Sequence, residues 1–330
     1  MAAGSALVAE AQRIADEVLF PAALVTDAAD IVWRELLDVL ADAGLYGLFV
    51  PERLGGLGAD PATGCLVIEA LAGGCLTTTF VWLQHQFSAV AISASEPAMR
   101  SLWIGDLASG RRRSGVAFAH LRRPGPPVVL AELADHGWIV SGSAPWVTGW
   151  DRIDLVVVGA RSGDDVVWLL VDAVASDTMR ADRLRLAALD ASATVELHFS
   201  AHVVPASRVI AIEPLQEWMA RDAAGMRTNG SLALGIAARC ARLLESTALD
   251  DRIGECRAAL DTAGIEQMPA ARAAVSVLAV EAAATLVASV GGRSMVRDHH
   301  AQRLAREALF LLVQGQTPTI RLEQRRSLGL

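Results

Sequence analysis

Two side chains stand out as candidates for acid–base chemistry in this chain of 330 residues. His120, in the segment AFAHLRRPGPP, could stack on a ligand, bind phosphate or transfer a proton, or it could be an ordinary loop histidine. Asp222 is a candidate base, although an acidic residue at a helix start also offsets the helix dipole. All 29 basic residues are arginine, which excludes lysine Schiff-base and P-loop chemistry.

Metal and nucleic-acid sites are not expected. The cysteines form no CxxC pair and no zinc spacing with histidine, so we expect buried free thiols at Cys65, Cys75, Cys240 and Cys256 and no metal. The formal charge of −8 and the short basic run Arg111–Arg113 give no attraction to nucleic acid.

The hydrophobic periodicity divides the chain into three parts. Residues 4–110 show helical spacing, interrupted by a loop at 50–60, and residues 114–210 alternate with the period of strands. DLVVVGA and DVVWLLVDA, separated by a turn, indicate a hairpin. Helical patterns return from Pro214, at 217–250, 269–290 and 299–313. We therefore predict a mostly α protein with a central β domain, divided at 1–112, 113–212 and 213–330; this order excludes a Rossmann fold.

The N-terminus and the hydropathy pattern argue against secretion and membrane insertion. The first twenty residues carry acidic groups and no basic segment ahead of an apolar core. Although 53% of the residues are hydrophobic, no run of about 18 consecutive apolar residues occurs. We expect a soluble, cytoplasmic protein.

Several motifs, in order, resemble those of the acyl-CoA dehydrogenase superfamily. They are GLYGLFVPERLGGLGAD at 44–60, SGSAPWVTGW at 141–150, VASVGGRSM, and QRLAREALFLLVQGQTPTIR. The resemblance covers essentially the whole chain and implies an N-terminal helical domain, a middle β-barrel and a C-terminal helical bundle. It also implies FAD as cofactor, an acyl-CoA or other acyl thioester as substrate, and a dimer with the flavin at its interface.

The resemblance assigns Trp146 and Thr148 to the flavin. A flat ring needs an aromatic or apolar wall, and its N5 and O4 need a donor. A strand places residues i and i+2 on one face, so the two side chains could act together. The alternative is a core tryptophan and a threonine selected for strand propensity.

The C-terminal motifs supply the other matched positions. Gly291 and Gly292 match a turn that lets backbone approach a cofactor, or they simply connect two helices. Arg306 matches the family's arginine, or it belongs to a surface ion pair, since Arg303 and Glu307 on that helix are four apart. Gln314, Gly315 and Gln316 match the closing loop, and Gln314 takes the position of the catalytic glutamate. An amide has no basicity near neutral pH, so Gln314 cannot be the general base.

Further departures surround the cofactor. Ala119 and His120 replace polar and acidic positions of a flavin-contacting loop, and Met226 and Arg227 stand where other members place a relocated base. The Arg-Lys-x-Phe-Gly stretch that reaches the cofactor diphosphate is missing; Arg252 or Arg257 could substitute.

The leading hypothesis is a flavin-dependent oxidoreductase that catalyses α,β-dehydrogenation of an acyl thioester, with a relocated or partner-supplied base. One alternative is a non-catalytic subunit that pairs with an active homologue. The other is a flavin monooxygenase on the same fold. We expect a homodimer or a heteromer with a homologue. The sequence indicates neither the acyl chain nor the electron acceptor.

Overall fold

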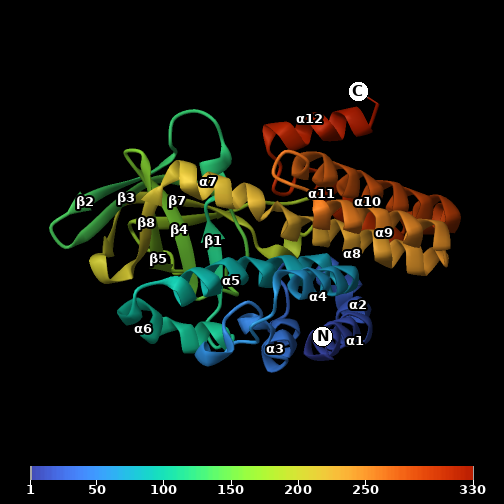
Figure 1. Ribbon diagram of the computed structural model, residues 1–330, viewed down its shortest axis with the longest axis horizontal. Helices are drawn as coiled ribbons and strands as arrows, with labels where there is room; N and C mark the ends of the chain where they lie inside the picture. Colours follow the sequence, from blue (N-terminus) through green and yellow to red (C-terminus); the bar gives the residue numbers. More distant parts are fainter. Residues whose placement is uncertain (1, 330) are drawn as a thin grey trace.

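The computed structural model describes residues 2–329 and consists of N-terminal helices, a central β-sheet and C-terminal helices (Figure 1). The predicted architecture is confirmed. The chain changes from helix to strand between Ala108 and Ser114, and back to helix after Pro214. The domain limits at residues 112 and 212 remain a prediction.

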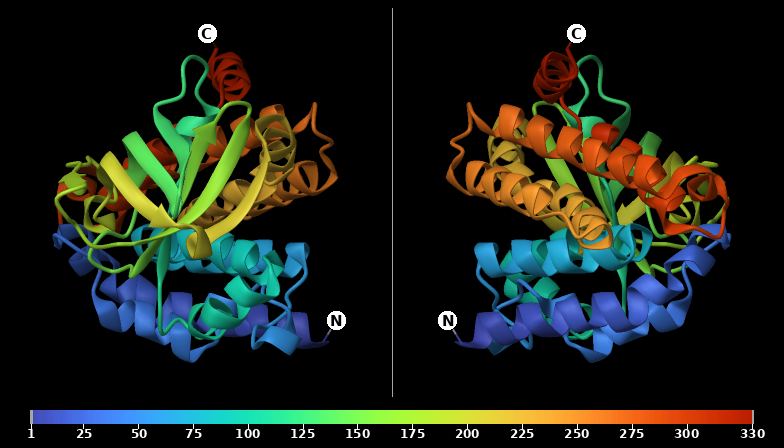
Figure 2. Two further views of the ribbon diagram at one scale, coloured as in Figure 1. Left: turned by 90° about the vertical axis from the view of Figure 1, so that its left-hand side faces the viewer. Right: turned by 90° about the vertical axis from the view of Figure 1, so that its right-hand side faces the viewer.

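The N-terminal helices form a layer under the rest of the molecule. They are α1 (Ala2–Ile14), α2 (Phe20–Ala28), α3 (Arg34–Asp42), α4 (Pro61–Gly74), α5 (Leu76–Ala94) and α6 (Pro97–Ala108), with a π-helical turn, η1 (Ala15–Leu19), between α1 and α2. Asp60 caps α4 by accepting from the backbone N–H groups of Ala62 and Thr63, both at 3.0 Å. The sheet and the C-terminal bundle both lie over this layer (Figure 2).

The middle segment forms one sheet in the order β6-β7-β3-β2-β4-β5-β8, with β1 beside β4. Its strands are β1 (Ser114–Ala117), β2 (Val129–Ala134), β3 (Gly137–Val147), β4 (Leu155–Ser162), β5 (Asp165–Asp172), β6 (Met179–Arg183), β7 (Val195–Pro205) and β8 (Val209–Pro214). The predicted hairpin is the antiparallel pair β4–β5. Within the described residues, the edge strands β6 and β8 are not paired with each other, so the sheet does not close into a hydrogen-bonded barrel.

The C-terminal bundle packs on the N-terminal layer through α4 and α8. Its helices are α7 (Leu215–Ala224), α8 (Met226–Leu244), α9 (Thr247–Thr262), α10 (Met268–Val290), α11 (His300–Val313) and α12 (Pro318–Ser327). The helical stretch predicted at 217–250 is thus divided among α7, α8 and the start of α9. A Cβ at Gly235 of α8 would collide with the carbonyl oxygen of Glu69 in α4, so glycine sets how closely these helices approach.

One segment of the bundle passes a length and hydropathy test for a membrane span. Residues Met268–Met295, mostly α10, are long and apolar enough to cross a membrane, with a mean hydropathy of 2.0. Half of that apolar window is buried among the other helices of the bundle. The segment contains no long uninterrupted apolar run, because Arg272, Ser276 and Glu281 divide it while the average hydropathy stays high. A buried core helix passes the same test.

Candidate functional site

Gln314 ends α11 and begins the loop to α12. Its Nε2 donates to Oδ1 of Asn229, on α8, at 3.1 Å. Its backbone carbonyl accepts from Nη2 of Arg272, on α10, at 3.4 Å. The Oε1 atom is buried and has no partner among the described residues. Three helix segments distant in sequence therefore meet at the residue that the sequence motifs align with the family's glutamate.

The start of α8 offers no base beside Gln314. Met226 is buried, and Arg227 donates through Nε to Oδ1 of Asp261 at 2.6 Å. Asp261 is the only carboxylate that Arg227 contacts within residues 2–329, and it is already engaged in this ion pair. The neighbourhood of Gln314 therefore supplies amides and cations, which bind and polarise but do not remove protons.

Asp222 is engaged in an ion pair and is not at a helix start. It lies in the last turn of α7, where a negative charge is unfavourable to the helix dipole, so the dipole explanation is wrong. Both carboxylate oxygens accept from Arg122, at 2.6 and 2.7 Å. Arg122 ends the short helix η4 (Ala119–Arg122), so this contact ties the loop after β1 to α7.

His120 is a buried structural histidine. Its ring is 5% exposed, and Nε2 donates to the carbonyl oxygen of Gly159 at 2.8 Å. Burial lowers the pKa of His120 to about 4. The ring is therefore neutral at neutral pH and lacks the positive charge with which an imidazolium would bind phosphate.

Trp146 and Thr148 do not share a face. The pairing of β3 with β7 shifts register between Ala144 and Val147, and Trp146 adopts φ 64°. This irregularity turns the Trp146 side chain outward, 45% exposed, while Thr148 is 2% exposed and lies 3.0 Å from the hydroxyl of Thr194. The i, i+2 rule failed because it assumes a regular strand.

Gly291 and Gly292 are remote from Gln314 within one chain. They precede α11, whereas Gln314 follows it, and 14 residues of α-helix span roughly 20 Å. Gly291 ends α10 with φ 72°, and both glycines are exposed. Arg306 pairs with Asp27 of α2 and contacts the carbonyl of Ala187, so it joins the bundle to the other layers.

The remaining candidates are committed to intramolecular contacts. Gln316 donates to the Leu312 carbonyl at 3.0 Å and to Gln324 at 2.7 Å, which holds the loop against α12. The proposed diphosphate arginines are both in ion pairs, Arg252 with Glu281 and Arg257 with Glu69.

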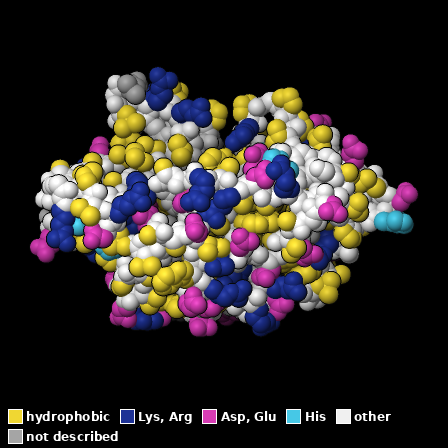
Figure 3. Space-filling view, turned by 180° about the vertical axis from the view of Figure 1, so that it is seen from behind, with side chains coloured by type: hydrophobic (Ala, Val, Ile, Leu, Met, Phe, Trp, Pro, Cys, Tyr) yellow, Lys and Arg dark blue, Asp and Glu magenta, His cyan; other side chains and the backbone are white. Residues whose placement is uncertain are grey.

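The structure thus brings Gln314 together with Arg272 and Asn229, which sequence reasoning missed. Arg272 could have been flagged as a lone cation in the Ala-rich segment MPAARAAVSVLAV. In Figure 3 the outline is notched between α12 and the loop that follows η4. Gln314, Gly315 and Asn229 are half-buried, so the cluster extends from the surface inward.

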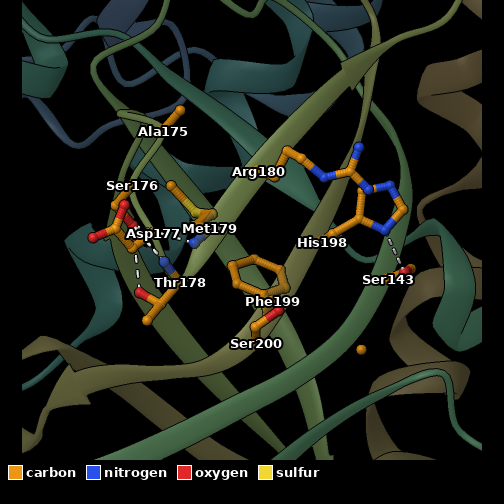
Figure 4. A pocket seen from close by; sticks show the side chains of 11 residues that line it. Ser143, Ala175, Ser176, Asp177, Thr178, Met179, Arg180, His198, Phe199 and Ser200 are labelled. Carbon is orange, nitrogen blue, oxygen red and sulfur yellow. Dashed lines mark hydrogen bonds between the residues drawn. The ribbon is translucent and has the colours of Figure 1, made fainter.

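A second group of polar residues lines a hollow of about 480 Å³ on the sheet (Figure 4). Ser143 Oγ lies 2.8 Å from Nδ1 of His198, whose Nε2 lies 3.2 Å from Asp182. This serine–histidine–aspartate series of contacts resembles a serine-hydrolase triad, but Asp182 is 45% exposed and also pairs with Arg180. A carboxylate shared in this way does not supply the buried orienting group of a triad.

Comparison with known proteins agrees with this architecture. Residues 3–111 match the family model for the acyl-CoA dehydrogenase N-terminal domain. The whole chain superimposes on butyryl-CoA dehydrogenase from Megasphaera elsdenii with a TM-score of 0.86 and 17% identity, covering 100% of this chain and 99% of that one. Residues 3–111 thus carry the N-terminal domain of the acyl-CoA dehydrogenase family, and the whole chain shares the fold of its members.

The family relatives are distant. (2S)-Methylsuccinyl-CoA dehydrogenase of Cereibacter sphaeroides is 26% identical over 46% of this chain and 28% of its own. Benzylmalonyl-CoA dehydrogenase of Aromatoleum aromaticum is 27% identical over 46% of this chain and 42% of its own. The alignments therefore span less than half of either relative. A structure of PigA with FAD and proline has a TM-score of 0.84 at 18% identity, over 99% of this chain and 97% of that one.

Proposed function

We propose that this protein is a flavin-dependent oxidoreductase that acts on an acyl thioester, with its base relocated or supplied by a partner. The match of residues 3–111 to the family model and the acyl-CoA substrates named for the relatives support the proposal. The surroundings of Gln314 are the observation that supports a base located elsewhere. Among the described residues, its side chain contacts the amide of Asn229 and no carboxylate.

One residue supports a place for the ring of FAD. Trp146 presents an indole that is 45% exposed at the end of β3, as a cover for a flat ring requires. Bound there, FAD would supply an acceptor for the β-hydrogen of the substrate as hydride. Its diphosphate needs a cation, and both arginines suggested for that role are in ion pairs. We therefore also propose a dimer, or a pair with a homologue, in which the partner completes the cofactor site. We further propose that the protein is located in the cytoplasm.

A non-catalytic subunit is the second candidate. The engagement of Asp222 by Arg122 favours it, because the one carboxylate suggested as a replacement base is tied up. Such a subunit would need a glutamate-bearing homologue to act.

A visible absorption spectrum of the purified protein, before and after incubation with excess FAD and gel filtration, tests the proposal. We expect bound flavin, and anaerobic addition of acyl-CoAs of different chain length and polarity should bleach it. Trp146→Ala should weaken flavin binding, whereas the exposed Trp33 gives a matched control, Trp33→Ala. A protein that retains no flavin, alone or with a co-purified homologue, would overturn the proposal; flavin bleaching only in the presence of the homologue would favour the non-catalytic subunit.

A further inference from the structure

Arg272 is a buried cation without a counter-charge. Its side chain is on α10 and is 1% exposed. A guanidinium has five N–H donors. Nη1 donates to Ser276 at 3.3 Å, Nη2 donates to the Gln314 carbonyl at 3.4 Å, and Nε has no partner among the described residues. Both contacts are long, so most of the hydrogen-bonding capacity is unused.

The other buried arginines show what is missing. Arg113 pairs with Asp38, Arg239 with Asp16, and Arg303 with Glu307. Arg272 alone among the four buried arginines of residues 2–329 pairs with no carboxylate. Burial by itself lowers the pKa of Arg272 to about 10, which remains high enough to keep the guanidinium charged at neutral pH. An unpaired charge in the interior is strongly unfavourable, so this arginine is suited to an anion from outside the chain.

The surroundings of Arg272 suit an oxygen-bearing anion. The Gln314 carbonyl lies at the C-terminal, negative end of α11 and compensates the charge only in part. If the amides of Gln314 and Asn229 both exchange oxygen and nitrogen, their mutual hydrogen bond is kept. Nε2 of Gln314 then takes the place of the buried, unpartnered Oε1 and becomes a second donor.

We propose that Arg272 and the amide of Gln314 bind an oxyanion, either a carboxylate on the acyl chain of the substrate or a phosphate of the cofactor. Gln314 then binds a ligand in the position where a glutamate would remove a proton. The identity of the ligand rests on the proposed function, whereas the presence of a site does not.

Thermal unfolding tests the site without flavin or CoA. We compare wild type with Arg272→Met, and with Arg252→Met as the control, because Arg252 is a half-exposed arginine paired with Glu281. At constant ionic strength, succinate or inorganic phosphate should raise the Tm of wild type and of the control above the value in chloride. In Arg272→Met this increase should vanish, and the Tm in chloride should equal or exceed that of wild type because an unpaired buried charge is gone. If the Met variant does not fold, Arg272→Gln takes its place.

Ligand affinities identify the source of the oxyanion. Succinyl-CoA and butyryl-CoA have acyl chains of four carbons and differ in the terminal carboxylate. Tighter binding of succinyl-CoA by wild type, reduced tenfold or more in Arg272→Met, assigns the site to a substrate carboxylate. A tenfold or greater loss of FAD affinity in the variant, with no discrimination between the two thioesters, assigns it to the cofactor phosphate.

The site is overturned if Arg272→Met binds FAD and both thioesters as wild type does, has a lower Tm than wild type in chloride, and shows the same anion-dependent change in Tm as wild type. A wild type that binds neither FAD nor acyl-CoA overturns the proposed function, and the succinate and phosphate shifts still report on the site.

Discussion

Arg122 and Asp222 are 100 residues apart in the sequence, yet one guanidinium donates to both oxygens of the carboxylate. Their side chains are 19% and 16% exposed, so the pair is largely withdrawn from water. It holds the loop after β1 against α7, beside the start of α8 that carries Asn229. The pair therefore joins two segments distant in sequence, and Asp222 is not free to act as a base.

Asp222→Asn should lower the free energy of unfolding by about 1–3 kcal/mol, because the negative charge and at least one of the two hydrogen bonds from Arg122 are lost. Urea denaturation measures this, and Arg122→Gln with the double variant shows whether the two effects are coupled. Flavin bleaching by an acyl-CoA should stay within tenfold of wild type. Loss of bleaching at unchanged stability would instead identify Asp222 as the base.

Gln314→Glu should raise the rate of flavin bleaching by acyl-CoA about tenfold or more, since a general base commonly contributes about 10²–10⁴-fold. The adjacent charge of Arg272 should lower the pKa of the new carboxyl, so the rate should rise with pH through that lowered pKa and then level off. Adding Arg272→Gln should move this rise to higher pH. An unchanged rate in the flavin-loaded variant would count against placing Gln314 in the active site.

Two buried histidines should make stability depend on pH. Burial lowers the pKa of His120 to about 4 and of His85 to about 3, from an ordinary value of 6.5. The unfolded chain therefore binds more protons below pH 6.5, and stability should be full above that value and decrease as the pH falls toward 4. At pH 5 each histidine should contribute a loss of about 2 kcal/mol. Urea midpoints from pH 7 to 5 should fall less steeply in His120→Gln, whereas His136→Gln, at an exposed turn, should follow wild type.

Gly235→Ala should destabilise the protein by about 1–3 kcal/mol, because the added methyl group would meet the Glu69 carbonyl where α4 and α8 touch. Gly254→Ala, in α9 with open space at its Cβ, should stabilise by about 0.5–1 kcal/mol through helix propensity. Thermal unfolding of both variants measures the difference. Equal stability of the two would show that the helices can separate without loss.

The sequence could predict what depends on local pattern. Alternation placed Val195, Leu197 and Phe199 on the buried face of β7, and the spacing of four placed Arg303 beside Glu307. The same spacing did not reveal that this pair is buried rather than on a surface, since the covering residues come from other segments, with Phe20 of α2 and Cys75 between α4 and α5 lying near Arg303.

The sequence by itself determined the order of helices and strands, the resemblance of its motifs to those of the acyl-CoA dehydrogenases, and the absence of a carboxylate at Gln314, because each follows from residue identity and short-range periodicity. Only the tertiary structure decided that Asp222 pairs with Arg122, that Trp146 and Thr148 face apart, and that Arg272 is buried beside Gln314 without a counter-charge. These relationships join segments tens to hundreds of residues apart, or depend on one irregular pairing of strands. Packing in three dimensions sets them, and spacing along the chain does not.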